Sequence, residues 1–136
     1  PVVQRIAGTP DVSLVLDAGA LLAIDRRDRR MGALLRVAQQ ERIAVRTSPA
    51  AVAQVLHHGA RQAHLARVLA GVAAPPLDLR IGGLLGALLA TSRTRDVVDA
   101  HVASLARAGD LVLTSDPEDL RHLLEALSID AAVVRV

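Results

Sequence analysis

The sequence contains no cysteine, no lysine and no aromatic residue, although 16 of its 136 residues are arginine. Because cysteine is absent, disulfide bonds and zinc sites built from thiolates are excluded. Because lysine is absent, the chain has no GxxxxGK(S/T) loop for nucleotide phosphates, no Schiff base and no lysine-assisted phosphoaspartate chemistry. We therefore expect no nucleotide cofactor. Without aromatic rings, the chain cannot recognise nucleic-acid bases by ring stacking.

Long hydrophobic runs are also absent. The longest apolar run, residues 81–90, includes three glycines and is half as long as the run of about 20 residues that a membrane-spanning helix needs. The first residues lack the basic and then apolar pattern of a secretory signal. The formal net charge of +2 and the mean hydropathy of +0.36 exclude a disordered chain. We expect one folded domain over residues 1–136, located in the cytoplasm and without a membrane segment.

Short aliphatic runs alternate with amphipathic segments along the whole chain. This alternation predicts an α/β fold in which a parallel sheet is covered by helices on both faces. The expected strands are residues 13–16, 43–46, 77–79, 111–113 and 132–136. We expect seven helices. Five of them cover residues 28–41, 48–58, 61–72, 81–90 and 96–107, and the other two begin at residues 17–19 and 115–117.

Four aspartates occupy related positions in this pattern. Asp17 follows the first expected strand and Asp116 comes three residues after the fourth, so both fall on the carboxyl edge of the sheet, where ligands of such sheets bind. Asp96 and Asp99 are three residues apart at the start of a helix and lie on its outer side, away from its apolar stripe. Clustered carboxylates need a cation, and hard divalent ions prefer oxygen ligands. Such a site suits phosphodiester hydrolysis.

A simpler explanation exists for the same residues. Asp17, Asp96 and Asp116 each stand where a helix N-cap is expected, and Asp96 with Asp99 resembles a capping box. Caps explain each acid separately but not their common edge. The residues alone therefore leave both a metal site and a set of caps open.

Three segments together are similar to a known family. SLVLDAGALLAID (13–25), DVVDAHVASLA (96–106) and LVLTSDPEDLRHLL (111–124) resemble the PIN domain, particularly the toxins of VapBC-type toxin–antitoxin pairs. The resemblance implies a three-layer sandwich with a central parallel sheet of five strands. It also implies an acidic site for Mg²⁺ or Mn²⁺, metal-dependent cleavage of RNA, a homodimer, and inhibition by a small antitoxin protein.

The resemblance assigns site residues by position. Asp17, Asp99 and Asp116 match the family's metal-binding acids, and Asp96 matches a frequent companion of the acid that opens the late helix. Thr114 matches a hydroxyl residue that can orient a carboxylate. We expect these five residues to be catalytic.

One position departs from the family. The helix after the second strand normally carries a glutamate, whereas the segment TSPAAVAQV carries Gln54. An amide can orient a metal-bound water, but it has no charge and cannot act as a general base. Gln54 is therefore the sixth candidate catalytic residue, and it makes a second metal ion less expected. It also keeps open the alternative of a weakened or inactive PIN-like module that binds RNA or protein.

Basic side chains near the acids are candidate phosphate ligands. Arg93 and Arg95 precede Asp96 directly, and we expect them to hold a substrate phosphate. The mixed run at residues 25–30 either contacts RNA or forms a solvated surface.

The remaining candidates have simpler explanations. We expect surface or interface roles for the histidines at 57, 58 and 64. For His101 we expect packing at the edge of the core, although contact with substrate is an alternative. Gly82 and Gly86 are expected to allow close helix packing. A receiver-like phosphoacceptor shares the acid at the end of a strand, but it needs a lysine that this chain lacks.

Overall fold

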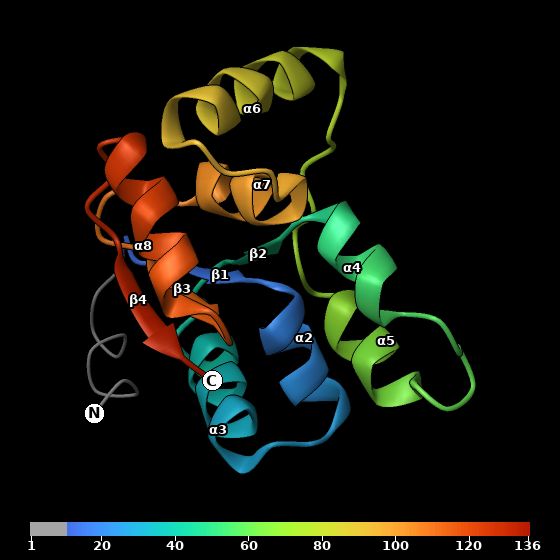
Figure 1. Ribbon diagram of the computed structural model, residues 1–136. Helices are drawn as coiled ribbons and strands as arrows, with labels where there is room; N and C mark the ends of the chain where they lie inside the picture. Colours follow the sequence, from blue (N-terminus) through green and yellow to red (C-terminus); the bar gives the residue numbers. More distant parts are fainter. Residues whose placement is uncertain (1–10) are drawn as a thin grey trace.

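The computed structural model describes residues 11–136, and over these residues strands alternate with helices (Figure 1). The strands are β1 (Leu14–Leu16), β2 (Val45–Thr47), β3 (Leu111–Thr114) and β4 (Ala132–Arg135). The seven helices of this range are α2 (Ala18–Asp25), α3 (Arg29–Gln40), α4 (Pro49–Val55), α5 (Ala63–Leu69), α6 (Leu79–Ser92), α7 (Val97–Leu105) and α8 (Pro117–Ala126). Every helix expected from the sequence is confirmed, and where an end was predicted it lies within three residues of the observed one.

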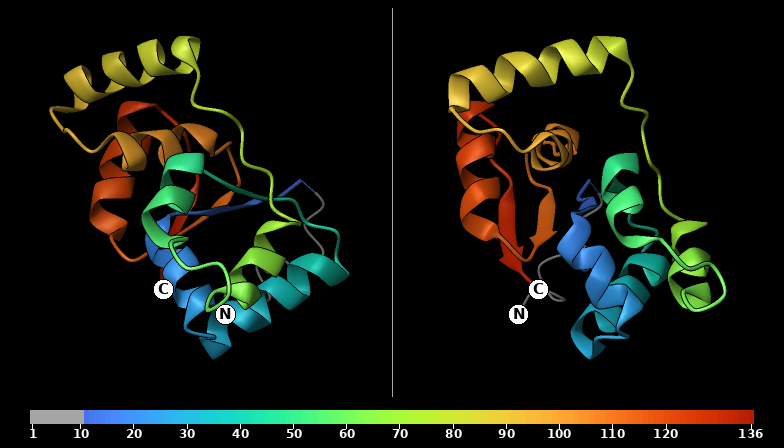
Figure 2. Two further views of the ribbon diagram at one scale, coloured as in Figure 1. Left: turned by 90° about the vertical axis from the view of Figure 1, so that its right-hand side faces the viewer. Right: turned by 45° about the vertical axis from the view of Figure 1, so that its right-hand side comes forward.

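The strands form one parallel sheet in the order β2-β1-β3-β4. Helices α2 and α3 lie on one face of the sheet, and α7 and α8 lie on the other (Figure 2). The predicted α/β architecture is therefore confirmed. The predicted number of five strands is wrong for residues 11–136, where the sheet has four.

The strand expected at residues 77–79 is the one that is missing. Asp78 is instead the N-cap of α6, and its carboxylate accepts a hydrogen bond of 2.9 Å from the amide of Ile81. Pro75 and Pro76 have no amide hydrogen to donate to a neighbouring strand, so the chain meets the sheet at a residue before them. Ala73 forms a single parallel bridge with Arg46 beside β2, through hydrogen bonds of 2.9 Å to Val45 and from Thr47.

The core is aliphatic throughout and is centred on β1 and β3. Every residue of Leu14–Leu16 and Leu111–Leu113 is at most 3% exposed, as expected for central strands with both faces covered. In α3, Met31, Leu34 and Ala38 lie on the buried side, in the spacing that predicted the helix. The core therefore holds the ends of the two central strands in fixed positions.

A buried ion pair fixes the opposite, amino-terminal edge of the sheet. Arg46 of β2 lies 2.5 Å from the carboxylate of Asp110, just before β3. Asp110 also accepts hydrogen bonds from the amides of Ser13 and Arg107, at 3.0 and 2.8 Å. The guanidinium of Arg46 makes further bonds to the hydroxyl of Ser13 and the carbonyl of Leu105, each at 3.2 Å. This pair therefore joins β1, β2, β3 and the end of α7.

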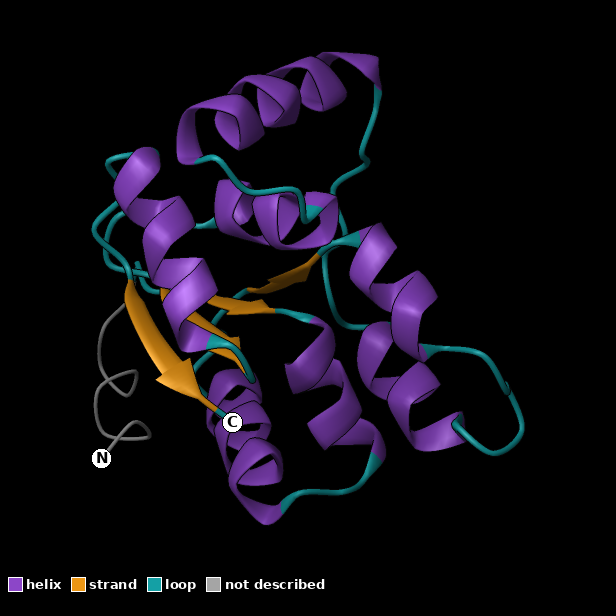
Figure 3. Cartoon of the chain, in the orientation of Figure 1, coloured by secondary structure: helices purple, strands orange, loops and turns teal. Residues whose placement is uncertain are grey.

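Helix α6 lies outermost, over α7 and α8 (Figure 3). Its surface is apolar, with Leu79 94% exposed and Leu84 58% exposed. A Cβ atom added at Gly82 or Gly86 would meet nothing within 4 Å. The predicted close packing at these glycines is therefore wrong for the described part of the chain. Among the helices of residues 11–136, none combines the length and the apolarity needed to cross a membrane.

Candidate metal centre at the carboxyl edge of the sheet

The topology places the carboxyl ends of β1 and β3 side by side. From β1 the chain continues to β2 on one side, and it later returns to β3 on the other side of β1. The order of strands therefore reverses between β1 and β3, which is where open parallel sheets bind their ligands. Leu16 pairs with Leu113, so Asp17 and Thr114 follow in register at this point.

Asp17 is buried at this edge, with 4% of its surface exposed. One carboxylate oxygen caps α2 by accepting a hydrogen bond of 2.8 Å from the amide of Ala20. The other oxygen accepts a hydrogen bond from the hydroxyl of Thr114, which in turn accepts one of 2.8 Å from the amide of Asp116. Burial raises the pKa of Asp17, although the bonds from Thr114 and Ala20 act in the opposite direction. Thr114 thus lies between the two acidic residues, as an orienting role requires.

Asp96 and Asp99 approach the same edge from the start of α7. Asp96 is the N-cap, and its side chain accepts a hydrogen bond of 3.0 Å from the amide of Asp99. Asp99 is half-buried. Burial, followed by the negative charges of Asp96, Asp17, Asp119 and Asp116, raises the pKa of Asp99 to about 7. The four predicted acids therefore lie close enough together to influence one another electrostatically.

Asp119 is a fifth acid of this cluster, and the sequence analysis missed it. It stands one turn into α8, after Asp116. A hydrogen bond shared with Asp116, together with the charge of that residue, raises the pKa of Asp119. The signal was present in the sequence, since Asp116 and Asp119 have the same spacing of three residues as Asp96 and Asp99.

The capping explanation accounts for only two of the five acids. Asp17 and Asp96 cap helices through their side chains, whereas Asp116 makes no such bond, and Asp99 and Asp119 lie inside helices. Within residues 11–136 the ion pair between Arg46 and Asp110 is the only one, so none of the five carboxylates has a basic partner. Asp96, Asp116 and Asp119 are exposed and hydrated, whereas Asp17 is buried and Asp99 half-buried, so a bound cation would favour the charged form of these two acids most.

The chemistry of these side chains fits a hard divalent cation. All five offer carboxylate oxygens, and Mg²⁺ takes one or two carboxylates from a protein and completes its shell with water and substrate phosphate. The carboxylates do not form a finished cage, because in the described residues no three His, Asp or Glu side chains converge closely enough to hold an ion. Asp17, Asp99 and Asp116 are the residues that would hold the ion.

The other predicted site residues are not drawn into this cluster. Gln54 is exposed on α4, and its side chain makes no hydrogen bond to the part of the chain that the structure describes. Arg93 ends α6 in the left-handed conformation, with φ 58°, and Arg95 lies in the loop before Asp96; both side chains are exposed. In the run at residues 25–30, Asp28 caps α3.

The histidines lie outside the carboxylate cluster. His57 and His58 are exposed after α4, which agrees with the expected surface position. His101 is 1% exposed, and its Nδ1 lies 2.7 Å from the hydroxyl of Ser48. Burial lowers the pKa of His101, so its neutral form is favoured.

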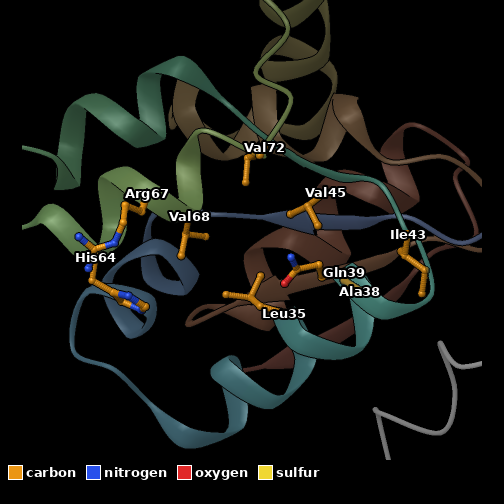
Figure 4. A pocket seen from close by; sticks show the side chains of 10 residues that line it. Leu35, Ala38, Gln39, Ile43, Val45, His64, Arg67, Val68 and Val72 are labelled. Carbon is orange, nitrogen blue, oxygen red and sulfur yellow. The ribbon is translucent and has the colours of Figure 1, made fainter.

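His64 lines a hollow of about 450 Å³ between α3, β2 and α5 (Figure 4). Its walls are mainly aliphatic, and its lining includes no acidic residue. This hollow therefore offers no carboxylate for a hard divalent cation. Its lining consists of Leu35, Ala38, Gln39, Ile43, Val45, His64, Arg67, Val68, Gly71 and Val72.

No protein-family model matches the chain, and no curated protein sequence matches it either.

Proposed function

We propose that this chain is a metal-dependent endoribonuclease of the PIN type, which hydrolyses RNA phosphodiester bonds at the carboxyl edge of β1 and β3. One observation carries the proposal: Asp17 ends β1 at the switch point of the sheet, four further aspartates of α7 and α8 lie near enough to interact electrostatically, and none of the five has a basic partner within residues 11–136. Asp17, Asp99 and Asp116 would hold Mg²⁺ or Mn²⁺. When bound, the ion would neutralise the cluster and stabilise charge that develops on the phosphate.

The chain's own residues would position the reacting groups. Thr114 donates to Asp17 and accepts from the amide of Asp116, which fixes both acids relative to each other. Gln54 cannot accept a proton, so a general base has to come from the carboxylates. The exposed Arg93 and Arg95, on the loop that leads to Asp96, would bind the phosphates of the substrate.

We extend the proposal to the partners that the family resemblance implies. The chain would form a homodimer in the cytoplasm, act as the toxin of a toxin–antitoxin pair, and be inhibited by a small antitoxin protein. The homodimer rests on the family resemblance alone, and the exposed Leu79 and Leu84 of α6 are the positions at which we test it.

The test is cleavage of a pool of structured RNAs by the purified protein with Mn²⁺, with Mg²⁺ or with EDTA. We expect cleavage that needs the metal and that falls by at least roughly 100-fold in Asp17→Asn, since residues that merely support a ligand already account for about 10–100-fold. Asp130→Asn is the matched control, because Asp130 is an exposed aspartate before β4, at the other edge of the sheet. Equal cleavage by the two variants would contradict the proposal.

A module that binds RNA or protein without cleavage is the second candidate, and Gln54 favours it. Gln54→Glu restores the charged side chain that the family has at this position. If only Gln54→Glu cleaves RNA, the natural chain is a weakened nuclease. If no variant cleaves while all remain folded, and Asp17→Asn still binds RNA in a gel-shift assay, the chain is a binding module.

A further inference from the structure

A second group of buried polar side chains lies at the end of β2, whose last residue, Thr47, pairs with Leu16. Ser48 is fully buried and His101 is 1% exposed, and 2.7 Å separate the hydroxyl oxygen from Nδ1. Ser48 is also the N-cap of α4, and its oxygen accepts a hydrogen bond of 3.1 Å from the amide of Ala50. The oxygen accepts from Ala50, and the hydroxyl hydrogen can be donated to Nδ1 of His101 in the tautomer that carries its proton on Nε2.

This bond joins α7 to the sheet close to Asp17. The residue before Ser48 is Thr47, and its buried hydroxyl donates a hydrogen bond of 2.7 Å to the carbonyl of Leu16. Leu16 is the residue directly before Asp17. Two buried hydrogen bonds therefore connect His101, two residues after Asp99 on α7, with the strand end that carries Asp17.

Helix α7 needs such an anchor if Asp99 is to stay near the other acids. Asp99 lies in the first turn of α7, and its carboxylate is repelled by the like charges of the other aspartates at this edge. The other buried side chains of α7 include Ala100, Val102 and Ala103, which are aliphatic and give non-directional packing. A satisfied buried hydrogen bond is directional and selects one arrangement of the elements that it joins.

We propose that Ser48 and His101 are positioning residues, which fix α7 so that Asp99 reaches the metal together with Asp17. This inference rests on the proposed function, because it concerns the same metal centre. Neither residue touches the metal or the RNA. The pair acts by setting the place of α7 relative to the carboxyl end of β1.

Two variants of His101 separate positioning from simple stability. His101→Leu fills a similar volume but removes the bond, and Ser48 keeps its cap on Ala50. His101→Asn keeps an oxygen at the position of Nδ1 and is the conservative rescue. His101→Leu leaves the buried hydroxyl of Ser48 without its partner, so we expect a folded protein with a lower urea midpoint than the parent, whereas His101→Asn should unfold close to the parent's midpoint.

The first measurement is the orientation of α7, from residual dipolar couplings of its amides in the metal-free protein. We expect His101→Leu to change the couplings of residues 97–105 and to leave those of α3 unchanged, with His101→Asn like the parent. The second is the Mn²⁺ concentration that half-saturates RNA cleavage. We expect it to rise about tenfold in His101→Leu, with the KM for RNA unchanged, and to be restored in His101→Asn.

Either of two results would overturn the inference. Unchanged couplings of α7 in His101→Leu would show that the pair does not position the helix. Changed couplings with an unchanged Mn²⁺ requirement would show that the position of α7 does not matter for the metal. If the parent binds Mn²⁺ without cleaving RNA, the proposed nuclease function fails but the positioning role can still be tested. The Mn²⁺ concentration that broadens the NMR signal of the Asp99 amide is then compared between the parent and His101→Leu in place of cleavage. A parent that binds no Mn²⁺ overturns both proposals.

Discussion

At the scale of single residues, Asp99 differs from the acids around it because, within residues 11–136, no hydrogen bond to its side chain offsets its burial. Asp17 caps α2 and Asp96 caps α7, so each has an amide that stabilises its charged form. Asp99 is half-buried, and its neighbours are other aspartates, which is why its pKa rises to about 7. Such an acid opposes folding when it is ionised and favours binding of a cation.

Asp99→Asn tests the sign of this effect. The pKa of Asp99 is raised in the folded state from 3.8 to about 7. Between about pH 4 and about pH 7, Asp99 is therefore protonated more often in the folded protein than in the unfolded chain. The stability of the parent therefore decreases as the pH rises from about 4 to about 7 in the absence of metal. We expect Asp99→Asn to lack this loss and to melt several degrees higher than the parent at pH 8, with little difference at pH 4. Thermal melts in EDTA measure both values, and an equal difference at the two pH values would contradict the raised pKa.

At the scale of secondary-structure elements, the start of α2 approaches the loop between β3 and α8 very closely. A Cβ atom added at Gly19 would lie 2.5 Å from Cβ of Ser115 and 3.0 Å from its amide nitrogen. Real Cβ atoms do not approach other atoms this closely, so only glycine allows the contact. Since Asp17 precedes Gly19 and Asp116 follows Ser115, the glycine sets how near the two acidic segments come.

Gly19→Ala is therefore expected to destabilise the fold by about 1–3 kcal/mol, the usual effect of overpacking. It is also expected to reduce any metal-dependent cleavage, because the β3–α8 loop has to move. Gly83→Ala is the matched control: Gly83 lies in α6, a Cβ atom there would meet nothing within 4 Å, and alanine should add up to about 1 kcal/mol of helix stability. Urea denaturation gives both values. A Gly19→Ala protein as stable as the parent would show that the loop yields without cost.

At the scale of the whole molecule, the two edges of the sheet are built in opposite ways. The amino-terminal edge holds the one ion pair of residues 11–136, and both partners are buried and make further hydrogen bonds. The carboxyl edge concentrates acids without basic partners. The first arrangement stabilises the fold, whereas the second suits a ligand that supplies positive charge.

Asp110→Ala would leave Arg46 buried without its partner. Because a broken buried ion pair costs about 3–5 kcal/mol, we expect this variant to lose a large part of its stability. Replacing both residues, as in Arg46→Met with Asp110→Ala, should recover part of the loss, because no charge then remains buried. Denaturation in urea measures the three proteins, and a single variant no less stable than the double one would contradict this account.

The proposed homodimer places a further prediction at this scale. Leu84 is 58% exposed on α6, and Leu79 and Val97 are exposed nearby in sequence. We expect Leu84→Glu to convert a dimer into a monomer in sedimentation experiments, while its circular dichroism spectrum stays unchanged. Leu22→Glu, at the less exposed Leu22 of α2, is the control and should remain dimeric. A dimeric Leu84→Glu protein would place the dimer surface elsewhere, and a monomeric parent would exclude the homodimer.

Local patterns in the sequence determined the elements and the edge on which the acids lie. The periodic spacing of Met31, Leu34 and Ala38 predicted α3, and the aliphatic runs ahead of Asp17 and Asp116 predicted β1 and β3. In a parallel sheet, a residue at the end of a strand has its place fixed by chain direction alone. That is why Asp17 and Asp116 could be placed from the sequence, whereas the position of Asp96 and Asp99 depended on where the start of α7 packs.

Contacts between distant segments decided the rest. The strand expected at 77–79 is absent because the Asp78 cap of α6 competes locally with pairing to the sheet, and the chain meets β2 at Ala73 instead. The pairs Arg46–Asp110 and Ser48–His101 join residues 64 and 53 positions apart. No periodic pattern in the sequence predicts such pairs, because the burial of a polar side chain depends on which helices and strands pack over it. Only the tertiary structure therefore decided which polar residues stabilise the fold and which carboxylates stay unpaired.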